Sequence, residues 1–560
     1  MVDANLRQLN RTHYGSSTIP VAAPFARRKA PQGVTATAVP RKSRSHKLRL
    51  SAAVLESPSI AIQAPSVLTE EKGKEEMETF NWTQQWYPLY FEEDLDTQHP
   101  NAVQLLGKDI VIWKAPDGSW SALEDMCPHR LAPLSGGRME EGTLHCSYHG
   151  WRFDASGRCT HIPQVSGKAA ATACASQRSC VASFPTQVAQ GMLWVWGDSS
   201  AAAHIHAAAK PAPTVAWMDS KDRLRRPDGG KLLPLGDCFM RDVPYSWATM
   251  VDNLCDPAHI HYAHHGLFGD RSDPNAGNVM VRAPQPEDAL GANIAGATDG
   301  LVYRVQMLMG ANRPLADTVL TVAFPGPFTL FTPKPKDLGG KADFESVMIY
   351  ATPLTSNKTR VLVTNYLADP GFGHVPLLMR LGLAATPKWL SHMTLNAVMD
   401  GDGVLLYGQE CAEKAIEAER GARWNQTFHM PASADKPVLN YRKWLDTRGG
   451  FGPFGPIPKV PTLPRAELVN RKSQHTDNCP TCTATLRNVR ALRIAGLFVS
   501  AVAAAAALGS ALLASAAAVR IGLAPLWLVG LSAVSAAAAY VSNELAKRLV
   551  YHPWDHSLRA

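Results

Sequence analysis

The chain has 560 residues with 46% hydrophobic content, enough for two or three domains that each have a core. The net charge of +8 comes from one end, because residues 1–50 contain ten Lys or Arg and one acid, which leaves 46 basic and 47 acidic residues elsewhere. Nucleic-acid-binding proteins carry their basic excess on a folded face, so this distribution argues against that class. Ten cysteines in a chain this long argue against a disulfide scaffold.

The first 55 residues are rich in Arg, Ser and Ala, are nearly free of acids, and contain no apolar run of signal-peptide length. This composition predicts an organelle transit peptide over residues 1–55, with a disordered basic tail as the alternative. Residues 56–79, which contain prolines and then an acidic run, are predicted to form a linker.

Two folded regions are expected next. The first, 80–200, has short strand-like runs separated by turn signals such as Ala115-Pro116-Asp117-Gly118. The second, 214–465, starts with a helix-capable stretch around Tyr245–His265 and ends with a helix within Leu377–Val398, which with the strands between them predicts an α+β domain. The expected strands are Gln104–Trp113, Ser119–Glu124 and Gly191–Gly197 in the first region, and Leu301–Met309, Val319–Phe331, Glu345–Thr352 and Thr359–Tyr366 in the second.

Two long uncharged spans lie near the C-terminus, Ile494–Val519 with 26 residues and Ile521–Tyr540 with 20. Each meets the length of about 20 residues that a membrane-spanning helix needs. They are predicted to form a two-helix transmembrane hairpin over 491–543, followed by a tail over 544–560, with a buried helical pair as the alternative. Lys and Arg flank both outer ends, which places the preceding domains and the tail on the same side of the membrane.

Two short loops carry the strongest signal in the sequence. Cys127-Pro128-His129 is followed, after sixteen residues, by Cys146-Ser147-Tyr148-His149. Each loop offers one thiolate and one imidazole, so the two Cys could hold one iron of a [2Fe–2S] cluster and the two His the other. A Cys₂His₂ zinc site is the alternative, but zinc fingers pair Cys with Cys and His with His.

A second group of Asp and His residues runs from Asp252 to His265. Two His and one carboxylate with open positions form the facial triad of non-haem Fe(II) oxygenases. His259 and His264 are five residues apart and share a helix face only through a distortion such as a π-bulge; in a regular helix His265 would replace His264. Asp256, one turn before His259, is predicted to hydrogen-bond its imidazole, with a helix N-cap before Pro at N1 as the alternative.

These motifs resemble the plastid Rieske oxygenases, the family that contains pheophorbide a oxygenase and the translocon-associated Rieske protein of the inner envelope. The resemblance rests on the two Cys/His loops, on the D/E-x₃-D-x₂-H-x₄-H pattern at 252–264, and on Cys479-Pro480-Thr481-Cys482 followed by two membrane spans. It implies an all-β Rieske [2Fe–2S] domain, an antiparallel-sheet and helix (helix-grip) catalytic domain, and a third iron ligand at Asp402, with Asp400 as the alternative.

The resemblance also implies a function. Reduced ferredoxin would supply electrons to the cluster. In a homotrimer, Asp256 would bridge from a cluster histidine of the neighbouring subunit to the mononuclear iron held by His259, His264 and Asp402 of its own chain. The substrates would be O₂ and a chlorophyll-derived tetrapyrrole, with macrocycle opening of pheophorbide a first and oxidation of protochlorophyllide or a phyllobilin as alternatives. The location would be a chloroplast membrane, inner envelope or thylakoid, with the catalytic domain in the stroma.

Cys479 and Cys482 lie in a predicted linker, 470–490, and are interpreted as redox thiols that thioredoxin could reduce. Half a zinc site with His475 and an inert exposed pair are the alternatives. For the whole chain, a non-enzymatic Rieske redox component of a membrane translocon is the rival class, which would need the cluster but not the second iron. A Rieske desaturase or choline-type monooxygenase is a further alternative, but neither resemblance includes the Cys pair and hairpin.

Overall fold

A computed structural model describes residues 79–560, except 216–217, 219–231, 235–237, 268, 275, 308–316, 334–343, 369–380, 383–384, 458–459, 517–523, 553–555 and 557–560. The predicted transit peptide and almost all of the first predicted linker lie outside the described residues. The described part belongs to one unit, Lys74–Ala560.

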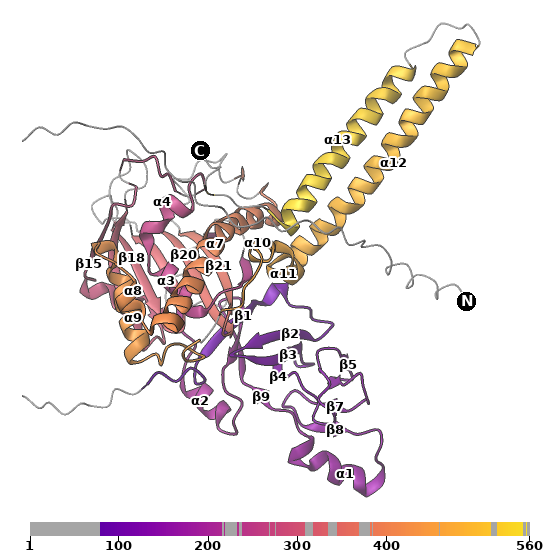
Figure 1. Ribbon diagram of the computed structural model, residues 1–560. Helices are drawn as coiled ribbons and strands as arrows, with labels where there is room; N and C mark the ends of the chain where they lie inside the picture. Colours follow the sequence, from indigo (N-terminus) through magenta and orange to yellow (C-terminus); the bar gives the residue numbers. More distant parts are fainter. Residues whose placement is uncertain are drawn as a thin grey trace, which may run out of the picture. The chain divides into compact units, whose positions relative to one another are not determined.

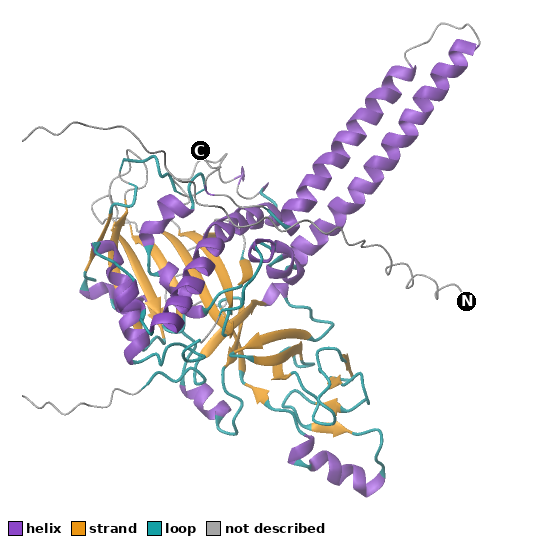
Figure 2. Cartoon of the chain, in the orientation of Figure 1, coloured by secondary structure: helices purple, strands orange, loops and turns teal. Residues whose placement is uncertain are grey.

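The first folded region is built from small antiparallel sheets (Figures 1 and 2). The strand orders are β2-β3-β4-β9, β5-β6-β7-β8 and β1-β11-β10. The predicted strand Gln104–Trp113 is interrupted at Leu106 and Gly107, which both have positive φ, as two-residue hairpin turns require. The elements are β1 Trp86–Phe91, β2 Asn101–Leu105, β3 Lys108–Lys114, β4 Trp120–Glu124, β5 Arg138–Glu140, β6 Thr143–His145, β7 Arg152–Phe153, β8 Cys159–His161, α1 Gly167–Ala175, β9 Ser183–Phe184, β10 Thr186–Ala189 and β11 Met192–Trp196.

The second region is an eight-stranded antiparallel sheet with helices α3, α7 and α9 on it (Figure 1). The strand order is β13-β21-β20-β19-β18-β17-β15, and β14 also pairs with β21. The strands are β13 Leu232–Pro234, β14 Phe239–Val243, β15 Val279–Arg282, β17 Gly300–Met307, β18 Asp317–Ala323, β19 Phe328–Pro333, β20 Phe344–Thr355 and β21 Lys358–Ala368, with the separate pair β12 Thr214–Val215 and β16 Ile294–Ala295. The helices are α2 Ala203–Ala209, α3 Trp247–Leu254, α4 Ile260–Ala263, α5 Leu290–Asn293, α7 Lys388–Arg420, α8 Trp424–Thr427, α9 Lys436–Thr447, α10 Arg465–Leu468 and α11 Arg471–Gln474.

Three further expected elements are divided or extended in the structure. The predicted strand Val319–Phe331 is two strands, because the turn at Phe324–Pro327 contains two prolines, which cannot donate to a sheet ladder. The predicted helix Tyr245–His265 is also divided, at Asp256-Pro257. The helix predicted within Leu377–Val398 begins at Lys388 among the described residues and continues to Arg420, through Gly401 and Gly403, because its buried face packs on the sheet.

The two regions share buried surface. Trp194 and Trp196 of β11 belong to the same hydrophobic cluster as Tyr350 of β20 and Leu362 of β21. Trp82, which the sequence assigns to the first region, packs edge-on against Trp247 of α3 at 4.8 Å between ring centroids. Two hydrophobic clusters therefore each contain residues from both sides of the predicted boundary.

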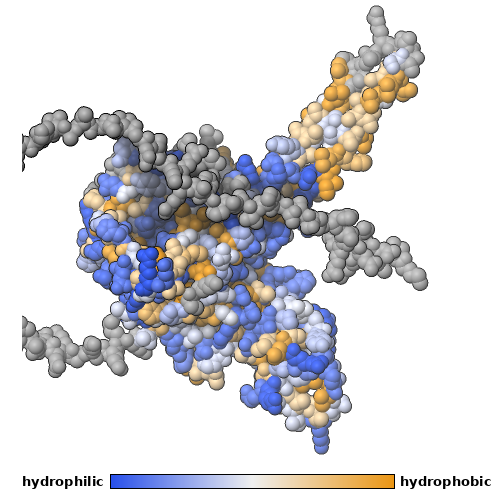
Figure 3. All heavy atoms as spheres, in the orientation of Figure 1, coloured by the Kyte–Doolittle hydropathy of each residue, from blue (hydrophilic) through white to orange (hydrophobic). Residues whose placement is uncertain are grey.

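The C-terminal hairpin consists of α12 Pro480–Ala516 and α13 Ala524–Val550, both long and apolar enough to cross a membrane. Figure 3 shows hydrophobic colour along both helices. The helices approach closely at small residues: a Cβ on Gly496 would lie 2.9 Å from the Ser535 carbonyl, and the hydroxyls of Ser500 and Ser532 lie 3.1 Å apart. Small residues and interhelical hydroxyl bonds are typical of helix pairs packed in lipid.

The predicted linker 470–490 is folded: it contains α11 and the start of α12, and several of its apolar side chains are buried. Leu486 and Val489 pack against Leu549 at the end of α13. The first residues of the predicted tail, from 544 to 550, belong to α13. The end of this helix is held to the predicted linker, because the Thr476 hydroxyl donates to the Leu549 carbonyl at 2.6 Å. From Leu492 onward many apolar side chains of α12 are exposed, which marks where contact with the folded domain ends.

Candidate iron sites

The two Cys/His loops fold in the same way. In each, the N–H four residues after the cysteine donates to that cysteine's carbonyl: Leu131 to Cys127 at 2.8 Å, and Gly150 to Cys146 at 2.9 Å. Both donor residues have positive φ, 60° and 74°. Each tight turn brings the cysteine and the histidine of its loop close together, and the two loops face each other.

The side chains of the four predicted ligands fit a two-iron cluster. Cys127 and Cys146 are buried, while His129 and His149 are partly exposed, with ring centroids 4.5 Å apart. The buried Nδ1 of His129 has no hydrogen-bond partner, as expected of a nitrogen reserved for a metal. Burial raises the pKa of the Cys127 thiol to about 11, so metal ligation is what would keep this sulfur as the thiolate.

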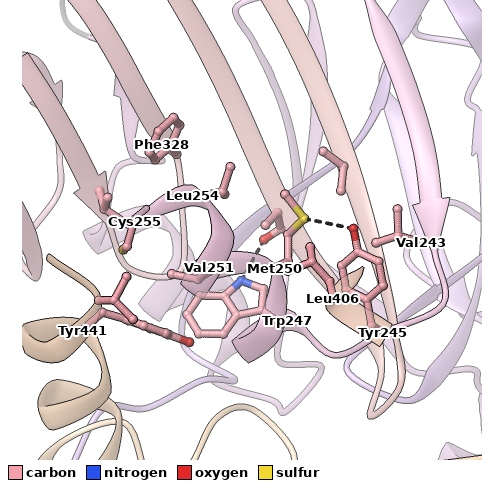
Figure 4. Packing of buried hydrophobic residues seen from close by; sticks show 14 of the residues in the cluster. Val243, Tyr245, Trp247, Met250, Val251, Leu254, Cys255, Phe328, Leu406 and Tyr441 are labelled. Atoms are coloured by element: carbon pink, nitrogen blue, oxygen red, sulfur yellow. Dashed lines mark hydrogen bonds between the residues drawn. The ribbon is translucent and has the colours of Figure 1, made fainter. Parts of the chain in front are cut away.

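The second site starts from helix α3, whose apolar face is locked into the core (Figure 4). The Trp247 indole N–H donates to the Ala351 carbonyl of β20 at 2.9 Å, and the Tyr245 hydroxyl contacts the Met250 sulfur at 3.7 Å. Arg442 of α9 donates to the carboxylate of Asp252 through Nε at 2.9 Å. Asp252, the first residue of the iron-binding pattern, therefore holds α3 to α9.

The structure brings His259, His264 and Asp402 together. Asp402 Oδ1 lies 3.9 Å from His259 Nε2, and Oδ2 lies 3.5 Å from His264 Nε2. One ligand atom from each residue lies within 4.8 Å of the other two, so a single ion could contact all three. Burial lowers the pKa of His264, which favours the neutral imidazole that metals bind.

The distortion expected between the two histidines is present, but it is not a π-bulge. His259 ends a 3₁₀ turn, Pro257–His259, and His264 directly follows the short helix α4. His265 lies apart from the triad, because its Nδ1 accepts the backbone N–H of Arg271 at 3.1 Å. His261 is buried but is not a member of the metal-binding group.

Of the two roles predicted for the Asp256 side chain, the structure has the N-cap but not the hydrogen bond to the His259 imidazole. Asp256 Oδ1 accepts the Ala258 N–H at 2.8 Å, which is the N-cap. Its Oδ2 lies 4.0 Å from His259 Nδ1, too far for a hydrogen bond, and Nδ1 instead contacts the backbone carbonyl of Asp256. The backbone of Asp256 therefore orients the imidazole, and its carboxylate stands beside it, with a pKa that burial raises.

Asp400 and Asp402 have different surroundings. Asp400 is fully buried between Arg241 and Arg471, each with an Nη2 at 2.7 Å from one of its oxygens. These two contacts lack hydrogen-bond geometry, but Arg471 Nε also donates to Oδ2 at 2.9 Å. The Asp400 carboxylate is therefore occupied by two cations, whereas Asp402 faces the two histidines.

Two residues near these sites were not identified from the sequence. The Asn253 amide lies 3.3 Å from His259 Nε2, and nothing in its spacing distinguishes it from a surface residue. His392 lies with His475, Cys479 and Cys482 in a second compact group of possible metal ligands. All four are buried, so the alternative of an exposed Cys pair is wrong.

The chain is similar to several known proteins. A model of the Rieske [2Fe-2S] domain matches residues 85–185, which contain all four loop ligands, and a model named pheophorbide a oxygenase matches 324–419, which contain Asp402. The chain is 32% identical over 492 residues to the chloroplastic pheophorbide a oxygenase of Oryza sativa subsp. japonica, covering 83% of this chain and 87% of that protein. It is 30% identical over 505 residues to the Arabidopsis thaliana protein of the same name, covering 87% and 86%. A solved structure of dicamba monooxygenase bound to 3,6-dichlorosalicylic acid is 21% identical, covers 67% of this chain and 98% of that chain, and has a TM-score of 0.49.

Proposed function

The chain belongs to the pheophorbide a oxygenase family of Rieske oxygenases, and we propose that it uses O₂ and electrons from reduced ferredoxin to open the macrocycle of pheophorbide a. It is an oxygenase with a Rieske [2Fe–2S] cluster and a mononuclear non-haem iron. The observation that carries the proposal is the convergence of His259, His264 and Asp402, because an electron carrier would need only the first site.

In this proposal the ligands divide between two groups. Cys127, His129, Cys146 and His149 would hold the cluster, and His259, His264 and Asp402 would hold the iron. When bound, the cluster supplies single electrons and the iron supplies activation of O₂. The chain's own task at the second site is to hold three ligand atoms in place and leave positions free.

The surrounding residues support that positioning. The Asp256 carbonyl holds the His259 ring, and Trp247 holds α3 against the sheet. The apolar face of α7 packs on the sheet, and in this orientation Asp400 faces Arg241 and Arg471 while Asp402 faces the two histidines.

We further propose that electrons pass between subunits of a homotrimer. The rings of His129 and His149 are partly exposed, and the side chain of Asp256 is 35% exposed, so both are accessible to another copy of the chain. Leu131 and Tyr148, beside the cluster histidines, are 66% and 61% exposed and would meet a protein partner such as ferredoxin. The thioredoxin-dependent role of Cys479 and Cys482 stays a prediction.

The relatives are chloroplastic proteins, and α12 and α13 could anchor the chain in a membrane. We propose a chloroplast envelope or thylakoid membrane, with the catalytic domain in the stroma. Arg487, Arg490 and Arg493 before the first span and Lys547 and Arg548 after the second support this orientation.

The test is oxygen incorporation by the full-length protein with both iron sites filled. It is supplied with reduced ferredoxin, ¹⁸O₂ and, in separate reactions, pheophorbide a, protochlorophyllide or a phyllobilin, and products are read by mass spectrometry. We expect ¹⁸O in a ring-opened product of pheophorbide a, and none with His259→Ala. Labelling of another tetrapyrrole alone would contradict the substrate, and no labelling by fully loaded protein would indicate a redox component.

A further inference from the structure

Four possible metal ligands form a group separate from both iron sites. His392 lies on α7, His475 follows α11, and Cys479 and Cys482 lie at the start of α12, the first helix of the hairpin. All four side chains are at most 3% exposed. Helix α7 and the stretch 475–482 therefore place two imidazoles and two thiols around one buried point.

The distances match those between the corners of a tetrahedral zinc site. With Zn–N of about 2.05 Å and Zn–S of about 2.3 Å, such a site separates nitrogens by about 3.3 Å and nitrogen from sulfur by about 3.6 Å. His392 Nδ1 lies 3.2 Å from His475 Nε2. Cys482 Sγ lies 3.3 Å from His475 Nε2 and 3.5 Å from His392 Nδ1, and Cys479 Sγ lies 3.6 Å from His392 Nδ1.

The hydrogen bonds on the far sides of the rings fix which nitrogens face the centre as lone pairs. His392 Nε2 lies 3.0 Å from the Cys238 carbonyl, and His475 Nδ1 lies 2.6 Å from the Met240 carbonyl. A carbonyl can only accept, so each of these nitrogens carries the ring proton. In the neutral rings His392 Nδ1 and His475 Nε2 then have lone pairs that face each other, an arrangement that a cation between them stabilises. Metal-binding histidines usually donate their other nitrogen to such a carbonyl.

The ligand set and the space identify the ion. One Zn²⁺, two thiolates and two neutral imidazoles carry no net charge, which is compatible with complete burial. Two nitrogens and two sulfurs in tetrahedral arrangement favour zinc, and four protein ligands leave no open position, as in structural rather than catalytic sites. All four ligand atoms lie within 4.8 Å of one another, whereas the four residues of the Rieske loops do not form so compact a set, so the centre has room for one ion and not for a two-iron cluster.

We propose that His392, His475, Cys479 and Cys482 bind one structural Zn²⁺ ion that fastens the membrane hairpin to the catalytic domain. The same helix, α7, carries His392 and Asp402, so the ion joins the base of the hairpin to the helix that supplies the third iron ligand. Leu486 and Leu549 pack beside the ion's ligands and continue this junction into α12 and α13.

The experiment measures zinc in the full-length protein, purified in detergent with its iron. We expect about one zinc per chain, with an X-ray absorption spectrum at the zinc edge that reports two sulfurs at about 2.3 Å and two nitrogens at about 2.0 Å. His392→Ala and Cys482→Ser should lose this zinc and keep the Rieske EPR signal. Cys411→Ser, on the same helix but outside the group, should keep both.

A measurement on the unaltered chain covers the case in which those variants fail to fold. Cys479 and Cys482 should resist alkylation until a zinc chelator is added, while Cys411 should react equally with and without it. Zinc absent from protein that retains its iron would overturn the proposal, as would a Cys479–Cys482 disulfide that dithiol reduces without metal release. Iron held by these four ligands would overturn the assignment to zinc. None of these outcomes depends on which substrate the enzyme oxidises.

Discussion

Replacing Asp400 by alanine is expected to destabilise the catalytic domain while leaving its mononuclear iron in place. The carboxylate is 0% exposed and is contacted by Arg241 and Arg471 at 2.7 Å each. Truncation would leave two buried guanidinium groups without their anion. Breaking a buried ion pair by removing one partner costs about 3–5 kcal/mol. For a cooperative unit of about 250 residues, that loss lowers the melting temperature by roughly 6–20 °C.

The matched control is Asp402→Ala, two residues along the same helix. Asp402 faces His259 and His264, so its loss should remove the mononuclear iron and lower the melting temperature by much less than the Asp400 change. Thermal unfolding followed by tryptophan fluorescence and iron content per chain, both on full-length protein in detergent, separate the two effects. Iron lost from Asp400→Ala at an unchanged melting temperature would show that the ligand assignment is reversed.

Other changes test the remaining assignments. His149→Ala should abolish the Rieske EPR signal and spare the mononuclear iron; stoichiometric zinc in place of the cluster would refute this. His259→Ala or His264→Ala should remove mononuclear iron and turnover while the cluster signal persists, and a lost cluster signal would mean that the two sites are not independent. Asp256→Asn should keep thermal stability, because Asn caps helices about as well as Asp, but should slow single-turnover product formation measured by stopped flow. Normal turnover in Asp256→Asn would show that Asp256 acts only as a helix N-cap. Alkaline extraction of membranes should retain the full-length protein, because α12 and α13 are long and apolar enough to span the bilayer, and its release would contradict integral insertion.

Local sequence was sufficient where the ligands of a site lie on one short segment. Cys127 and His129 share one loop, and Cys146 and His149 share another, so their chemistry could be identified before the loops were placed in space. The two uncharged spans were equally evident, because the bilayer thickness sets the length of apolar sequence that is needed, and that length can be counted without knowing any tertiary contact. The α+β character of the second region followed in the same way from the order of its strand-like and helical runs.

Helix interruptions were harder to assign, because they depend on competing local interactions. The helix start at Asp256-Pro257 was only the alternative interpretation of Asp256. The sequence also did not show that a 3₁₀ turn, and not a π-bulge, would bring His259 and His264 together. The hairpin turn at Leu106-Gly107 was missed because Leu has no preference for positive φ.

Only the tertiary structure decided between Asp400 and Asp402. Asp400 and Asp402 are two positions apart on one helix, so their side chains point in directions about 200° apart. One of them must therefore face away from the histidines, but the sequence does not show how α7 is rotated about its axis. That rotation depends on how the apolar face of α7 packs on the sheet, which places Asp400 against Arg241 of β14 and Arg471 of α11, both far from it in sequence. The position of His392 beside His475, Cys479 and Cys482 likewise depends on the packing of α7 against β14 and α12. Local chemistry thus determined which residues could bind metal, and long-range packing decided which of them meet.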